Sequence, residues 1–169
     1  MHFYCERCKK EYPVATHAYA CECGGLFRLY QTAMDAEDCH EAVTLGETET
    51  PLLPLKVDGH QFFFKMEDRQ PTGSFKDRGA KRLIGELAHL GIDHVAVDSA
   101  GNAGAAVAAY AAAAGIACRV YVPDDISAER AKQIAAYGAA VIRVPNGRMN
   151  AGSTARVELG SDYYASHIY

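Results

Sequence analysis

Strand-like and helix-like segments alternate along the chain from residue 94 to residue 160. HVAVDS, ACRVYVP and AVIRV are short apolar runs typical of strands, and each is followed by a helical pattern: AGAAVAAYAAAAG, SAERAKQIAAYG and RMNAGSTARVELG. The first two helical patterns end at Gly115 and Gly138, and glycine commonly ends a helix. Because parallel strands are joined by helical crossovers, the alternation predicts an α/β fold with a three-layer parallel sheet covered by helices on both faces.

A different pattern precedes this alternation. PLLPLKV and QFFFKME lie on either side of Asp58-Gly59, which predicts two strands joined by a turn. FKDRGAKRLIGELAHLG then repeats apolar residues near the helical period. Ser74 and Asp77 form an S-x-x-D pattern like a capping box, so we expect Ser74 to be the N-cap of this helix. Asp77 and Arg78 are expected to pair as surface charges.

Lys76 falls in the first turn of the predicted helix. The helix macrodipole is positive there and disfavours a cation by about 0.3–1 kcal/mol, which favours the neutral amine. A neutral lysine amine is a nucleophile that forms Schiff bases with carbonyl compounds, pyridoxal phosphate (PLP) among them. Taken alone, the motif is more typical of an ordinary capped helix that carries a solvent-facing lysine.

A second segment of interest, DSAGNAGAAVAAY, joins a predicted strand to a predicted helix. Open α/β sheets bind ligands at the carboxyl ends of their strands, where free N–H groups attract anions. Gly101 and Gly104, with Asn102 between them, would let the backbone approach a bound carboxylate or ring. The segment matches neither the dinucleotide fingerprint nor the P-loop, so a nucleotide-binding domain is disfavoured. An ordinary strand-to-helix turn is the alternative.

Four of the six cysteines lie within the first 23 residues. No apolar run approaches about 18 residues and no signal-peptide core is present, so we expect a cytoplasmic protein, in which clustered cysteines indicate metal rather than disulfides. Four thiolates suit tetrahedral zinc, and the candidate ligands are Cys5, Cys8, Cys21 and Cys23. The second pair has C-x-C spacing in place of C-x-x-C, and His17 could substitute. Zinc binding and a metal-free ribbon both stay open.

The net charge and the length of the chain limit its possible partners and its number of domains. The net charge of −4, with histidine neutral, argues against nucleic acid or a membrane surface as partner. A chain of 169 residues is long enough for one domain with its own core and short for two. We therefore expect a small module of short strands and turns at residues 1–32, attached to a single larger unit at residues 33–169.

Four motifs together resemble the threonine synthases, which are PLP enzymes of fold type II. These motifs are LGETETPLLPL, PTGSFKDRG, SAGNAGAAVAAYAAAAGI and YVPDDISAERAKQIAAYGA, so the resemblance runs from about Leu45 to the end of the chain. Several members also carry a cysteine-rich ribbon similar to CERC…CECGGLFRLY. The resemblance implies a zinc-ribbon-like module at 1–32, the N-terminal part of a fold-type II catalytic domain at 33–169, and a homodimer in the complete enzyme.

The resemblance also implies a reaction and roles for individual residues. The family converts O-phosphohomoserine and water to threonine and phosphate in amino-acid biosynthesis, with PLP as the electron sink. Lys76 would be the Schiff-base lysine and proton shuttle, Phe75 would lie beside the cofactor, and Asn102 would hydrogen-bond its phenolic oxygen. The residues implied to surround the carboxylate of the amino-acid substrate are Ser99, Gly101, Asn102 and Ala103.

The chain departs from the family pattern in three places. Gln70 stands where related chains commonly have asparagine, and Ala100 where many have serine. The family's glycine-rich loop for the PLP phosphate has no equivalent before Tyr169, so the chain is expected to lack the C-terminal half of the enzyme. The alternatives are a serine or threonine ammonia-lyase, a cysteine-synthase-type β-replacement enzyme, and a truncated, non-catalytic paralogue that binds zinc or a partner.

Overall fold

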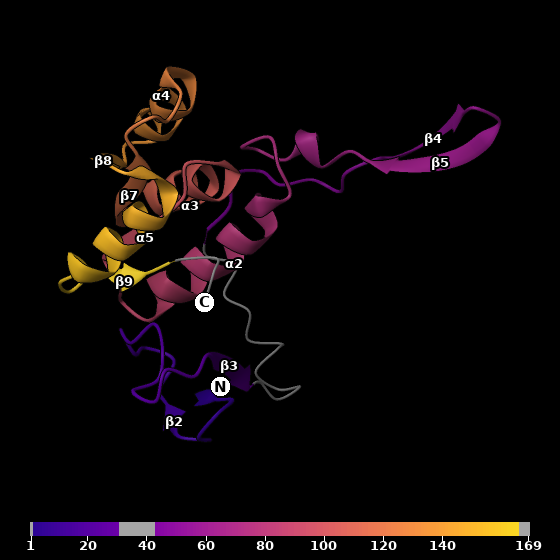
Figure 1. Cartoon of the computed structure of the whole chain (residues 1–169). Helices are drawn as coiled ribbons and strands as arrows, with labels where there is room; N and C mark the ends of the chain where they lie inside the picture. The colour runs from indigo at the N-terminus through magenta and orange to yellow at the C-terminus, as the bar shows by residue number, and fades with distance from the viewer. Residues whose placement is uncertain (1, 31–42, 166–169) are drawn as a thin grey trace.

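The computed structural model describes residues 2–30 and 43–165 (Figure 1). The predicted boundary between residues 32 and 33 and the residue Cys39 lie outside these ranges. The helices are α2 (Lys76–His89), α3 (Asn102–Ala114), α4 (Ala128–Ala136) and α5 (Gly147–Val157), with a short 3₁₀ turn, η1 (Glu67–Arg69). The strands are β1 (His2–Cys5), β2 (Glu11–Tyr12), β3 (Phe27–Tyr30), β4 (Leu52–Val57), β5 (His60–Lys65), β6 (His94–Val97), β7 (Ala117–Pro123), β8 (Ala140–Val144) and β9 (Tyr163–Tyr164).

The main sheet is parallel, as the alternating pattern predicts. Its strand order is β8-β7-β6-β9, and every neighbouring pair is parallel. Val120 of β7 pairs with Val97 of β6 on one side and Val141 of β8 on the other. Strand β9 was not expected from the sequence, and it adds Tyr163 and Tyr164 to the sheet beside β6.

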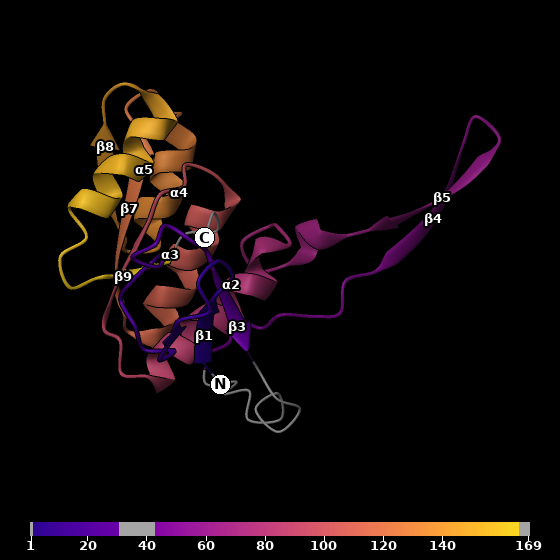
Figure 2. The same ribbon diagram turned by 60° about the horizontal axis from the view of Figure 1, so that its bottom comes forward.

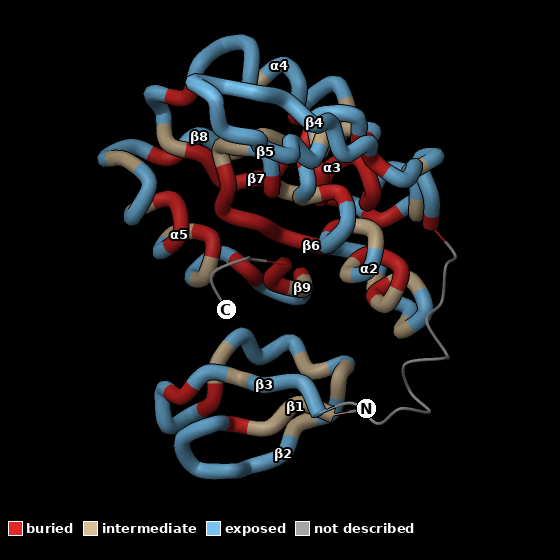
Figure 3. Tube along the Cα trace, turned by 90° about the vertical axis from the view of Figure 1, so that its right-hand side faces the viewer, coloured by how far each residue is buried: buried red, intermediate tan, exposed pale blue. Residues whose placement is uncertain are grey.

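Helices cover both faces of this sheet, which confirms the three layers. Alternate strand residues point to opposite faces. Val95, Val97, Val120 and Val122 share one buried cluster with residues of α2, α3 and α4, whereas Ala96, Tyr121 and Tyr164 share another with Ala151 and Ala155 of α5. In the burial view, β6 and β7 are buried over most of their length between these layers (Figure 3). The core therefore holds the carboxyl end of β6 and the start of α3 in fixed positions.

Helix α3 lies deepest among the helices that the structure describes. Nine of its 13 residues are buried, mostly alanines whose small side chains allow close approach to the sheet and to α2. The helix ends at Gly115, whose positive φ of 71° is the left-handed conformation that glycine adopts readily. Gly138, just after α4, has a φ of 86° and plays the same role there, as predicted.

The predicted hairpin is present and projects away from the sheet (Figures 1 and 2). Strands β4 and β5 pair antiparallel, and Asp58 and Gly59 both have positive φ, as a tight type I′ turn requires. Every residue of the two strands is exposed. The pairs Leu53–Phe64 and Leu55–Phe62 share one face, so this hairpin presents an apolar surface to its surroundings.

The N-terminal residues form a separate small sheet of order β2-β1-β3. Short strands and turns were predicted for this part of the chain. This sheet and its loops, residues 2–30, are called the cysteine module below. The module lies beside α2 and β9 (Figure 3). No helix in residues 2–30 or 43–165 is long and apolar enough to cross a membrane.

Candidate active site

Residues 70–75 form the loop that leads into α2, called loop 1 below. Asp77, which is fully buried, turns back from the helix and accepts hydrogen bonds from the Thr72 backbone N–H at 2.6 Å and from the Thr72 hydroxyl. Gly73, with φ of 84°, makes the bend that brings Thr72 into reach. A carboxylate of the first helical turn therefore fixes the shape of the loop before it.

Two expectations for this region are wrong. The N-cap of α2 is Phe75, which makes no side-chain cap hydrogen bond, while the Ser74 hydroxyl accepts a longer bond of 3.3 Å from the Lys76 N–H. Asp77 does not pair with Arg78 at the surface, because its carboxylate is occupied by Thr72. Arg78 instead forms a bidentate ion pair with Glu67, with N–O distances of 2.8 and 2.9 Å.

Lys76 is the first residue of α2, in the first turn as predicted, and is half-buried. Its Nζ lies 4.9 Å from the centre of the Phe75 ring, which is itself 57% exposed. Lys76 also lines a hollow of about 220 Å³ between α2 and α3, together with Gly79, Ala80, Leu83, Ala103, Val107 and Ala165. The structure thus brings Lys76 and Ala103, two predicted site residues that are 27 positions apart, to one hollow.

Residues 98–101 form the second loop, loop 2, between the carboxyl end of β6 and α3. Ser99 is buried, and its hydroxyl accepts a hydrogen bond of 3.4 Å from the Gly101 N–H. Asn102 is exposed and begins α3. A Cβ on Gly104 would lie 2.1 Å from the Ser99 carbonyl oxygen, so only glycine allows α3 to pack this close to the loop. Loop 2 therefore presents Asn102 and backbone groups at the start of a helix.

Glu47 braces the two helices that carry these loops. It accepts a hydrogen bond of 2.5 Å from the Tyr110 hydroxyl of α3 and forms an ion pair of 3.2 Å with Lys81 of α2. Burial acts to raise the pKa of Glu47, but the hydrogen bonds from Tyr110, the Leu45 N–H and Thr44 outweigh it and lower the pKa to about 2. Burial and the bond to Glu47 raise the pKa of Tyr110, so its hydroxyl stays a donor.

No role for Glu47 was predicted from the sequence, although it lies in the motif LGETETPLLPL. Glu47 and Tyr110 are 63 positions apart, and no local pattern links them. The Asp77–Thr72 contact spans five positions and was also missed, because the S-x-x-D pattern assigned Asp77 to a capping box with Ser74 instead.

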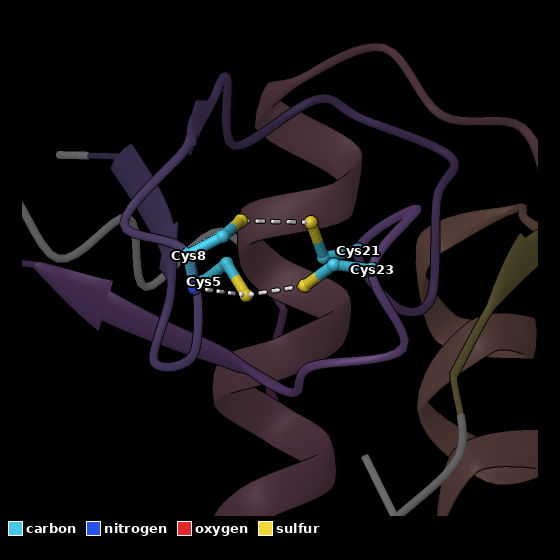
Figure 4. Close-up of side chains that lie close together, drawn as sticks. All are labelled: Cys5, Cys8, Cys21 and Cys23. Atoms are coloured by element: carbon cyan, nitrogen blue, oxygen red, sulfur yellow. Dashed lines mark hydrogen bonds between the residues drawn. The ribbon is translucent and has the colours of Figure 1, made fainter.

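The four predicted metal ligands lie together in the cysteine module (Figure 4). Their Sγ atoms all lie within 4.8 Å of one another, with 3.5 Å between Cys5 and Cys23 and between Cys8 and Cys21. A tetrahedral zinc ion with bonds of about 2.3 Å would separate its sulfur ligands by about 3.8 Å, so the cluster fits zinc closely. His17 is outside this group, and its ring packs against Tyr163 instead, at 6.2 Å.

The C-x-C spacing of the second pair is accommodated by the two glycines that follow it. Gly24 has φ of 75° and donates its N–H to the Cys21 carbonyl at 2.7 Å. A Cβ on Gly25 would lie 2.5 Å from Cys5 Sγ, so glycine is needed beside the cluster. The Tyr12 hydroxyl, 3.1 Å from Cys21 Sγ, is the main cause that lowers the pKa of Cys21 to about 6. A thiol that ionises readily suits metal binding.

The α/β fold with its parallel sheet is similar to that of PLP-dependent enzymes of fold type II. A hydrogen sulfide-producing enzyme from Fusobacterium nucleatum is similar, with a TM-score of 0.61 and 26% identity over 69% of this chain and 41% of that one. O-ureido-L-serine synthase matches with a TM-score of 0.60 and 29% identity, over 69% of this chain and 40% of that one. These likenesses define the class of fold.

The family follows from the sequence comparison. Residues 43–169 match the model of the pyridoxal-phosphate dependent enzymes, and the chain belongs to this family. The threonine synthase of Synechocystis sp. is 35% identical over 151 residues, and that of Methanocaldococcus jannaschii is 32% identical over 171 residues. These matches cover 85% and 83% of this chain, but the chain spans only 40% and 42% of the length of the two relatives.

The residues around the hollow fit pyridoxal phosphate. Lys76 lines the hollow, its Nζ lies 4.9 Å from the centre of the Phe75 ring, and the small residues Gly79, Ala80 and Ala103 line the space between the helices. The Asn102 side chain lies exposed at the adjoining start of α3. A primary amine, an aromatic face and an amide are the groups that would bind the aldehyde carbon, the ring and the phenolic oxygen of this cofactor.

Proposed function

We propose that this chain carries the lysine-bearing part of a PLP-dependent lyase that converts O-phosphohomoserine and water to threonine and phosphate. The supporting observation is the hollow that Lys76 shares with the start of α3, in a chain whose sequence relatives include threonine synthases. Because the chain spans about 40% of the length of these relatives, the reaction is proposed for the chain together with the remainder of the fold.

Each proposed role belongs to a residue of loop 1, of loop 2 or of the start of the helix that follows each loop, and Lys76 and Ala103 among these residues line the hollow. Lys76 Nζ would hold the cofactor and move protons at the substrate carbons, and the Phe75 ring would pack beside the cofactor. The Asn102 amide would orient the cofactor. The substrate carboxylate would be bound by loop 2 and the start of α3, through Ser99, Gly101, Asn102 and Ala103. When bound, PLP supplies an electron sink for charge that develops at the substrate carbon.

The wider organisation also stays a proposal. We assign residues 1–32 to a zinc-ribbon-like module and residues 33–169 to the N-terminal part of the catalytic domain. The supporting observation is the separate three-stranded sheet that the structure describes for residues 2–30. A homodimer of the complete enzyme and a cytoplasmic location stay predictions.

The first test is spectroscopic. We would titrate PLP into the chain and into a chimera that adds the C-terminal part of the Synechocystis relative. A visible absorbance band should appear in the chimera at least, and Lys76→Ala should abolish it. Lys132→Ala is the matched control, because Lys132 is exposed on α4, away from the hollow, and its loss should leave the band unchanged. An unchanged spectrum in the chimera would exclude the proposed role of Lys76.

The second test separates reactions on the same fold. The structural neighbours include a hydrogen sulfide-producing enzyme and O-ureido-L-serine synthase, which favours a β-replacement reaction as the second candidate. Release of phosphate from O-phosphohomoserine without ammonia would support the threonine synthase reaction. Release of sulfide from cysteine, or of ammonia from serine or threonine, with no turnover of O-phosphohomoserine would support a β-replacement enzyme or an ammonia-lyase instead.

Zinc binding is proposed from the cysteine cluster. The purified chain should contain about one zinc per molecule, and Cys8→Ser or Cys23→Ser should remove it. Cys118→Ala is the control, because Cys118 is buried on β7 outside the cluster. Zinc content without any PLP-dependent absorbance, in the chain and in the chimera, would favour a non-catalytic zinc- or partner-binding paralogue.

A further inference from the structure

The cysteine module contacts the main sheet through aromatic side chains. The Tyr19 ring packs edge-on against the Tyr164 ring of β9, with 5.6 Å between the centroids, and His17 packs against Tyr163 in the same way. Residues 16–19 and β9 enclose a small hollow of about 90 Å³. Tyr19 lies two positions before Cys21, so this contact comes from the same loop that carries the second cysteine pair.

Tyr164 connects that contact to the carboxyl end of β6. Its hydroxyl donates a hydrogen bond of 2.8 Å to Asp98 Oδ1, and both residues are buried. On the other side, a Cβ on Gly152 of α5 would lie 2.8 Å from Asp98 Oδ2, so the carboxylate lies against the backbone of that helix. A buried carboxylate is costly unless it is hydrogen-bonded, and β9 therefore fixes the orientation of the Asp98 side chain.

Asp98 is the first residue of loop 2. The next residue, Ser99, has its carbonyl against Gly104 of α3. The first two residues of the loop are thus held by different contacts, Asp98 through its side chain and Ser99 through its carbonyl against the helix backbone. The group that holds its start comes from β9, which itself carries the ring contact to Tyr19 of the cysteine module.

We propose that the cysteine module positions loop 2 through Tyr19, Tyr164 and Asp98. Tyr19 acts by the packing of its ring and Tyr164 by its hydroxyl, and Asp98 passes the constraint into the backbone before Ser99 and Asn102. All three residues would act by holding loop 2 in place, and none of them needs to touch a reacting atom. The inference rests on the proposed function only for the ligand-binding role of the loop, since the coupling itself requires neither PLP nor substrate.

The test is amide hydrogen exchange of the full 169-residue chain, followed by mass spectrometry. Peptides that cover residues 98–104 report on loop 2, and peptides from β7 serve as the internal reference. Tyr164→Phe keeps the ring but removes the hydroxyl, so exchange at 98–104 should rise roughly tenfold. Tyr19→Ala removes the ring contact and should raise exchange there by about threefold to tenfold, while β7 stays unchanged.

Conservative variants separate this role from general destabilisation. Tyr19→Phe retains the ring and should exchange like the wild type at 98–104, whereas Tyr164→Phe should not. Tyr4→Ala is the matched control in the module, because Tyr4 lies on β1 and faces away from β9, next to Lys9. Wild-type exchange at 98–104 in either Tyr19→Ala or Tyr164→Phe would overturn the proposal. An equal rise in β7 would overturn it as well, because it would show loss of overall stability.

Discussion

The loops that lead into α2 and α3 end at the same hollow but are held by different means. Loop 1 is held by a side chain, because Asp77 reaches back from α2 to Thr72. Loop 2 is held by a backbone contact between Gly104 and the Ser99 carbonyl. A side-chain contact can be weakened in steps by substitution, whereas a backbone contact that excludes a Cβ tolerates no side chain. The two loops should therefore respond differently to mutation.

The largest effect is expected for Gly104→Ala. The added Cβ would lie 2.1 Å from a backbone oxygen, so α3 must move away from loop 2, at a cost of roughly 3 kcal/mol in the free energy of unfolding. Urea unfolding of the chain would measure this. Gly101→Ala is the control, because φ is −118° there and a Cβ would meet no atom within 4 Å. It should change stability by less than about 0.5 kcal/mol. Equal effects at the two positions would show that close packing does not hold loop 2.

The next effect is expected for Asp77→Ala in loop 1. The substitution removes a buried acceptor and leaves the Thr72 N–H and hydroxyl without it, which should cost about 2 kcal/mol. Asp68→Ala is the control, since Asp68 is exposed and should change stability by less than about 0.5 kcal/mol. Thermal unfolding would compare them. If Asp77→Ala were as stable as the control, the side chain would not be what shapes loop 1.

Some parts of the fold can be predicted from the sequence because they depend on local patterns. The parallel sheet and the glycine helix ends follow from the alternating pattern, because strand and helix periods are local properties of the chain. The position of Lys76 in the first turn of α2 also follows, since helix starts obey short spacings. Gly104 was expected to let the backbone approach a ligand, whereas the structure shows it packed against the Ser99 carbonyl. The convergence of four cysteines in the module was predicted from their crowding in the sequence and is confirmed by the structure.

Contacts between distant segments could not be predicted in the same way. Strand β9 has only two residues, and no strand was expected there from the sequence. The bond between Tyr164 and Asp98 joins residues 66 positions apart, and that between Tyr110 and Glu47 joins residues 63 apart. Such pairs depend on how the layers pack, which no local period specifies. The first of these bonds holds Asp98 of loop 2, and the second joins Glu47 to α3.

A pH-dependent prediction concerns Glu47, which braces both helices. Its folded pKa of about 2 lies below the ordinary value of 4.5, so its contribution to stability is complete above pH 4.5 and is lost as the pH falls towards 2. Glu47→Gln keeps the shape but loses the charge paired with Lys81. At pH 7 it should destabilise the chain by about 1 kcal/mol, after allowance for solvent screening.

Urea unfolding at pH 7, 4, 3 and 2 would test the role of Glu47. The difference between wild type and Glu47→Gln should shrink as the pH falls and vanish near pH 2. Lys56→Gln in the exposed hairpin is a charge control, for which no such difference is expected. A constant difference at every pH would show that the charge of Glu47 does not brace α2 and α3.

The smallest effects on stability are expected for substitution of two buried serines, Ser74 in loop 1 and Ser99 in loop 2. Ser74 accepts a hydrogen bond from the Lys76 N–H at 3.3 Å, and Ser99 accepts one from the Gly101 N–H at 3.4 Å. Because both bonds are long, Ser74→Ala and Ser99→Ala should each cost only about 0.5 kcal/mol, as measured by thermal unfolding. In the active chimera, only Ser99→Ala should raise KM for O-phosphohomoserine, because only Ser99 is proposed to contact the substrate. A cost at Ser74 as large as that of Asp77→Ala would show that loop 1 depends on its serine rather than on the buried carboxylate.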